Sequence, residues 1–130
     1  MAHVSEPLEC VAFMLIDGNR ILVEKRSETK KLLPGAIAIP GGHLEPDEVP
    51  ETALLRELNE ELNITPRRYT YVCTLLHQAE EYRRIHYFAV DSWLGELAAN
   101  EAESLQWISL NDLSALDLEI DALAVQAYLT

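Results

Sequence analysis

Basic side chains are scarce in this sequence. Its 130 residues include 10 lysines and arginines against 22 aspartates and glutamates, which gives a formal net charge of −12 at pH 7. A protein that binds a nucleic acid polymer needs a basic surface to neutralise phosphates, so the composition argues against such a partner. A small anionic substrate can still bind if metal ions bridge it to the carboxylates.

Long hydrophobic runs are also missing. No apolar stretch approaches the roughly 18 to 20 residues that a membrane span needs, and the N-terminus lacks the basic and apolar regions of a signal peptide. We therefore expect a cytoplasmic protein with no membrane partner. The length indicates one domain, residues 1–130.

Cysteine occurs only twice. Cys10 and Cys73 both lie in apolar, strand-like segments and lack the CxxC spacing of a metal or redox motif. We expect buried, reduced thiols rather than a disulfide or a metal site.

The periodicity of apolar residues predicts mostly strands with two helices. The expected strands are 8–15, 20–25, 36–39, 69–76, 84–93 and 106–108, and the expected helices are 50–62 and 121–129. Turns or loops are expected at 17–19, 29–33 and 78–83, and Pro40-Gly41-Gly42 is expected to stop the third strand. Strands on both sides of a central helix indicate an α+β sandwich.

The helix at 50–62 carries two opposed faces. Its apolar face is formed by Leu54, Leu55, Leu58 and Leu62, which fall within an arc of about 100°. Its acidic face is formed by Glu57, Glu60 and Glu61 at spacings where side chains meet and like charges repel. A solvated acidic surface is one reading of this face. A divalent cation such as Mg²⁺, which prefers carboxylate oxygens, is the other.

The spacing of the residues in and around this helix favours the cation site over the solvated surface. The order is Gly42, Glu48, Arg56-Glu57-Leu58, Glu60-Glu61 and Asn63-Ile64. It closely resembles the Nudix box, the signature of the Nudix hydrolases. That family has glycine where this chain has Asn63. Asparagine is the usual substitute where a helix ends in a left-handed conformation.

The resemblance continues toward the C-terminus, where the sequence is similar to the MutT-type branch of the family. It rests on the segments 86–88, 93–96 and 106–108 and on Glu101, Asp112 and Leu113. It implies an α/β/α sandwich with a mixed sheet. It also implies a Mg²⁺-dependent hydrolase, with Mn²⁺ as a possible substitute, that cleaves a nucleoside triphosphate to NMP and pyrophosphate. The substrate would plausibly be a damaged or non-standard nucleotide such as 8-oxo-dGTP.

Hydrolysis of a phosphoanhydride needs neutralised phosphates and a base near an oriented water. The box carboxylates Glu57, Glu60 and Glu61 would hold the metal, and a backbone carbonyl of Gly41 or Gly42 could add a ligand. The resemblance implies that Glu57 is the general base. It also implies that Glu101 is a further metal ligand, although Glu101 could equally be a surface residue.

Arg56 and Glu48 complete the box. Arg56 could touch phosphate, but an ion pair with Glu48 or a box carboxylate that fixes the loop suits its fork of donors better. Glu48 would then support the metal site from outside, or ligate a further metal.

Substrate contacts are expected from four residues outside the box helix. Arg26 ends the second strand and either contacts phosphate or is surface-exposed. His43 is either a loop residue or a contact, and His86 faces either the nucleoside or the core. By resemblance Asp121 reads the edge of the base, and its other possible role is that of an N-cap for the last helix.

Two other functions compete with the first. A coenzyme A or nucleotide-sugar pyrophosphatase is the alternative enzyme, although Lys31 and Ile39 depart from the coenzyme A motif. The ADP-ribose branch has a proline where this chain has Ala79 and Glu80, which argues against that branch. The second competing function is that of a non-catalytic sensing or RNA-binding domain. Such a domain would usually have lost box carboxylates, whereas this chain keeps Glu57, Glu60 and Glu61. The oligomeric state, monomer or homodimer, stays open.

Overall fold

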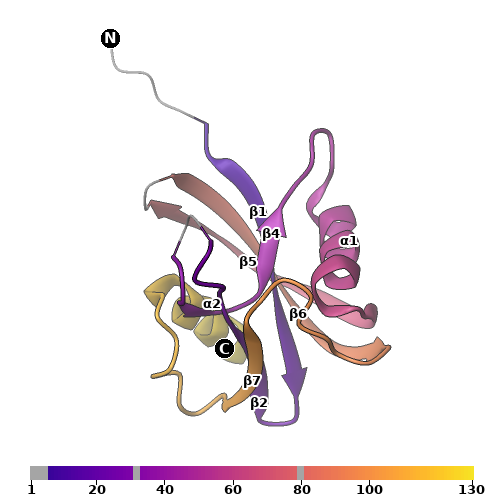
Figure 1. The fold of residues 1–130 in the computed structure, drawn as a ribbon, viewed down its shortest axis with the longest axis vertical. Helices are drawn as coiled ribbons and strands as arrows, with labels where there is room; N and C mark the ends of the chain where they lie inside the picture. Colours follow the sequence, from indigo (N-terminus) through magenta and orange to yellow (C-terminus); the bar gives the residue numbers. More distant parts are fainter. Residues whose placement is uncertain (1–5, 31–32, 79–80) are drawn as a thin grey trace.

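The computed structural model describes residues 6–30, 33–78 and 81–130. Within these residues, seven strands and two helices follow in the order β1 (Leu8–Asp17), β2 (Arg20–Lys25), β3 (Ile37–Ala38), β4 (Gly41–His43), α1 (Pro50–Leu62), β5 (Thr65–Gln78), β6 (Tyr82–Leu94), β7 (Ser104–Ser109) and α2 (Glu119–Leu129). Figure 1 shows α1 and α2 on different sides of the strands. No described helix is long and apolar enough to cross a membrane.

The sheet is mixed. Its strand order is β3-β2-β1-β6-β5, with β4 paired to β1 and β7 paired to β2. Strands β1 and β6 run parallel, whereas the other pairs are antiparallel. This arrangement confirms the predicted α+β sandwich.

Strand β1 supplies side chains to both faces of the sheet because successive residues point to opposite sides. Val11 and Phe13 pack in the core that includes Leu54 and Leu58 of α1. The alternate residues of β1, Ala12 and Met14, pack in a second core with Val125 of α2. The two helices therefore cover opposite faces of the sheet.

Helix α1 has the bounds that the sequence predicts. Pro50 lies in its first turn, and Asn63 ends it with φ 62° and ψ 32°, the left-handed conformation expected of that residue. The predicted apolar face is correct for Leu54, Leu58 and Leu62, which are buried. It is wrong for Leu55, which is 43% exposed because it lies at the edge of the stripe.

The strand boundaries differ more from prediction. Pro40-Gly41-Gly42 does not end the pairing, because β4 pairs with β1 through Val11 and Ala12. A Cβ on Gly41 would collide with the carbonyl oxygen of Val11, so glycine is what allows this close pairing. Strands β5, β6 and β7 and helix α2 extend beyond their predicted segments. Parts of the predicted loop 29–33 and turn 78–83 fall outside the described residues.

Candidate metal and active site

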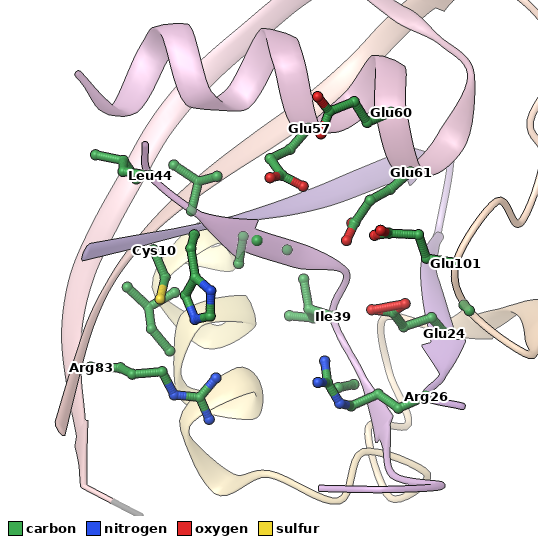
Figure 2. Close-up of a pocket in the computed structure, with 18 of the residues that line it drawn as sticks. Cys10, Glu24, Arg26, Ile39, Leu44, Glu57, Glu60, Glu61, Arg83 and Glu101 are labelled. Carbon is green, nitrogen blue, oxygen red and sulfur yellow. The ribbon is translucent and has the colours of Figure 1, made fainter. Parts of the chain in front are cut away.

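Carboxylates from several parts of the chain line one cavity of about 490 Å³. Strand β2 contributes Glu24, helix α1 contributes Glu57, Glu60 and Glu61, and the segment before β7 contributes Glu101. Figure 2 shows Glu24, Glu61 and Glu101 gathered on one side of this cavity.

Three of these side chains are close enough to hold one cation. Carboxylate oxygens of Glu57, Glu61 and Glu101 lie within 4.8 Å of one another. Two predicted ligands from the box and the predicted loop residue Glu101 therefore meet in space. Glu60 lies outside this group and accepts a hydrogen bond of 3.0 Å from Nη1 of Arg56. Its role as a ligand stays a prediction.

Burial makes this group of carboxylates electrostatically unfavourable. Desolvation, a hydrogen bond with Glu101 and repulsion by neighbouring carboxylates raise the pKa of Glu61 from 4.5 to about 10. Its Oε2 atom is buried with no hydrogen-bond partner. Burial also raises the pKa of Glu57, against the effect of Arg56. A divalent cation would supply the missing partner and offset the repulsion, so the residues present fit Mg²⁺.

Arg56 holds the loop that enters α1. Its Nε and Nη2 atoms both donate to Glu48 at 2.8 Å, Nη1 donates to Glu57 at 2.8 Å, and Nη2 reaches the carbonyl of His43 at 2.9 Å. The hydrogen bond from Arg56 lowers the pKa of Glu48 to about 2. The predicted ion pair of Arg56 with Glu48 is confirmed. Arg56 thereby orients Glu57 at the edge of the cavity, which both residues line.

Gly42 lets Glu57 lie against β4. A Cβ at this position would collide with the carboxyl group of Glu57. Both Gly41 and Gly42 line the cavity, so a carbonyl ligand from one of them stays a prediction.

The predicted substrate contacts do not all reach this cavity. Arg26, His43 and Asp121 line it. His86 does not, because its ring bonds Glu9 at 2.8 Å and Thr74 at 2.9 Å and lines a separate cavity beside Val49. The structure therefore corrects the placement of His86 at the nucleoside pocket.

Asp121 is a buried residue of α2 and not its N-cap. The N-cap is Leu118. Asp121 is 3% exposed, and its carboxylate accepts from the backbone N–H of Ile39 at 3.0 Å and from the hydroxyl of Tyr87 at 2.7 Å. These bonds tie α2 to the sheet beside the cavity.

Sequence reasoning missed Glu24 and Arg83. Glu24 is 7% exposed, and burial raises its pKa to about 7 although Arg26 and Lys30 lower it. The available signal was a carboxylate directly after the apolar run of Ile21 to Val23 in a predicted buried strand. No sequence pattern pointed to Arg83, because it falls in the predicted turn 78–83.

These pKa shifts predict how stability depends on pH without metal. The folded state binds protons on Glu24 and Glu61 more tightly than the unfolded chain does. The resulting stabilisation is fully present below about pH 4.5 and is lost as pH rises through about 7 for Glu24 and about 10 for Glu61. We expect the melting temperature of metal-free protein to fall between pH 5.5 and 8.5. Glu24 alone should contribute about 2 kcal/mol to this loss, since only the interval from pH 5.5 to about 7 counts.

Thermal unfolding with a chelator at several pH values checks this expectation. Glu24→Gln should flatten the pH dependence, whereas Glu119→Gln, which removes an exposed carboxylate, should leave it unchanged. Millimolar Mg²⁺ should raise the melting temperature more at pH 8.5 than at pH 5.5. A melting temperature that rises with pH in metal-free protein would contradict the assignment of these shifts.

Known proteins share this sequence pattern and fold. The NUDIX domain family matches residues 7–128. The 8-oxo-dGTP diphosphatase of Escherichia coli (strain K12) is 30% identical over 102 residues, 78% of this chain and 78% of that protein. The CTP pyrophosphohydrolase of the same organism is 36% identical over 96 residues, 72% and 68% of the two chains. The MutT NUDIX hydrolase structure from Burkholderia pseudomallei superimposes with a TM-score of 0.85 at 26% identity, covering 95% of this chain and 98% of that one.

Proposed function

We propose, since this chain belongs to the Nudix hydrolase family, that it hydrolyses a nucleoside triphosphate to NMP and pyrophosphate in a Mg²⁺-dependent reaction. The observation that carries the proposal is the meeting of Glu57, Glu61 and Glu101 within 4.8 Å at one side of a nucleotide-sized cavity. The two E. coli relatives support the substrate class, because both are named for nucleoside triphosphates. A damaged or non-standard nucleotide such as 8-oxo-dGTP is the substrate that the first of them suggests.

The residues divide into two roles. Glu57, Glu61 and Glu101 would hold Mg²⁺, with Glu60 and a carbonyl of Gly41 or Gly42 as further candidates. Mg²⁺ bound there supplies neutralisation of the phosphate charges. Arg26 and His43 line the cavity and would contact the substrate. Asp121 would contact the edge of the nucleobase.

The proposed chemical step follows the resemblance to the MutT-type branch and uses Glu57 as the base. Its carboxylate accepts the proton of a water whose oxygen bonds to the β-phosphorus. The bond from that phosphorus to the bridging oxygen breaks, and the bridging oxygen leaves with NMP. Arg56 keeps Glu57 in place and favours its ionised form, which a base requires.

Hydrolysis in H₂¹⁸O tests this function. We expect the label in pyrophosphate and none in NMP, because the water oxygen is transferred to the β-phosphorus. Mass spectrometry of the two products measures it. Label in NMP would move the attack to the α-phosphorus, and release of inorganic phosphate alone would contradict the proposed reaction.

A further inference from the structure

Arg83 presents an unused hydrogen-bond donor to the cavity. It lies near the start of β6, opposite Leu8 of β1 and His77 of β5, and its side chain lines the cavity. Its Nε atom is buried with no hydrogen-bond partner, and it forms no ion pair with any described residue. Arginine stays protonated and only donates, so a buried N–H without an acceptor is unfavourable. A ligand in the cavity could reach the Nη end of the same guanidinium, which has no hydrogen bond to a described residue.

Arg83 lies away from the carboxylates that would hold the phosphates. Figure 2 shows it across the cavity from Glu61 and Glu101, with its guanidinium directed inward. Arg26 lies much nearer the acidic side in the same view. With the triphosphate at the carboxylates, the opposite end of the cavity is left for the nucleoside.

The surroundings of Arg83 suit a flat and mostly apolar group. Cys10, Ile39 and Ile85 are buried and line the cavity. Tyr87 and Asp121 also line it, but their polar atoms already bond each other. Among the described residues of this region, Arg83 therefore offers a guanidinium group that lines the cavity and forms no ion pair with another described residue.

We propose that Arg83 reads the base of the substrate by donating its guanidinium fork to two adjacent acceptors on one edge. This inference rests on the proposed function for the orientation of the substrate. Cytosine offers O2 and N3, and guanine offers O6 and N7, the pair that arginine recognises in DNA. Adenine and uracil have no two adjacent acceptors on one edge, so the fork cannot bind either base through two atoms. In 8-oxoguanine N7 carries a proton, so the O6 and N7 pair is lost.

Equilibrium binding of nucleoside monophosphates tests this without catalysis. Calorimetry at pH 7.5 would compare CMP, GMP, AMP and UMP on wild type, Arg83→Gln, Arg83→Lys and Arg84→Gln. We expect wild type to bind CMP and GMP more tightly than AMP and UMP, and Arg83→Gln to lose about 10-fold to 100-fold in affinity for CMP and GMP. AMP and UMP should change by less than about 3-fold.

The variants separate base reading from other roles. Arg83→Lys keeps the charge but not the fork, so it should lose the base preference as well. Arg84→Gln is the matched control, because Arg84 is exposed and pairs with Glu9 at 2.7 Å, and it should bind all four like wild type. Arg83→Gln should keep or raise the melting temperature, because it removes an unsatisfied buried donor.

Three outcomes would overturn the inference. Equal affinity of wild type for the four monophosphates would show that no base is read. An equal loss for all four in Arg83→Gln would place Arg83 at phosphate or ribose. A lowered melting temperature with unchanged affinities would make Arg83 a structural residue. Failure of the proposed function would instead be seen as triphosphates left intact, whatever the monophosphate affinities are.

Discussion

Glu61→Gln should lower kcat by at least about 100-fold while leaving the fold intact. The substitution is nearly isosteric, but it removes one charge from the group formed by Glu57, Glu61 and Glu101, and its amide nitrogen cannot ligate a cation. Glu57→Gln should cause a loss of similar size, because it removes the proposed base. Steady-state kinetics of pyrophosphate release measures both.

In the absence of metal, Glu61→Gln should raise the stability of the protein, although it lowers kcat. The environment of Glu61 raises its pKa to about 10, so at pH 8 folding requires this carboxylate to take up a proton, a cost that a neutral glutamine avoids. We expect metal-free Glu61→Gln to melt above wild type at pH 8 and to gain less from Mg²⁺. Glu51→Gln, an exposed position on the same helix, is the control and should match wild type in both assays. Wild-type turnover in Glu61→Gln would contradict the metal site.

Arg56→Ala should be the most destabilising of the single substitutions considered. It would leave Glu48 and Glu57, whose side chains are 8% and 10% exposed, without their shared cation. The side chain of Arg56 is 21% exposed and therefore partly buried, so its loss should cost more than the loss of an exposed ion pair. Activity should fall as well, because Glu57 loses the group that orients it. Chemical denaturation at pH 7 measures the stability.

Arg68→Ala provides the comparison. Arg68 donates to Asp91 at 2.7 Å, a contact as short as those of Arg56, but the two side chains are 69% and 42% exposed. An exposed ion pair of this kind contributes little to stability. Similar losses of stability in Arg56→Ala and Arg68→Ala would mean that the hydrogen bonds of Arg56 are no more important than those of an ordinary surface ion pair.

Local sequence patterns were sufficient for α1 and for much of the site. Its periodicity and the preference of Asn63 for a left-handed conformation both act within a few residues, so the helix and its end could be predicted. The pairing of Arg56 with Glu48 could be predicted too, because both residues belong to one loop and helix. The strand at Gly41–His43 could not, because it depends on how closely β1 approaches the glycines.

The missed residues depend on the tertiary structure. Glu24 becomes part of the site only because β2 runs beside the segment that carries Glu101. Asp121 was expected at the start of a helix that in fact begins at Glu119, and its burial follows from bonds to Ile39 and Tyr87, far away in the chain. His86 occupies the strand predicted for it, but which face it points to is set by the register between β6 and its neighbours.

A substrate panel scored by product tests the central claim most directly. The panel would contain the four standard nucleoside triphosphates, 8-oxo-dGTP, coenzyme A and a nucleotide sugar, each with Mg²⁺ and with a chelator. We predict pyrophosphate from at least one triphosphate with Mg²⁺, none with the chelator, and slower cleavage of coenzyme A and the nucleotide sugar. Faster cleavage of either of those two, or hydrolysis that persists without a divalent cation, would contradict the account.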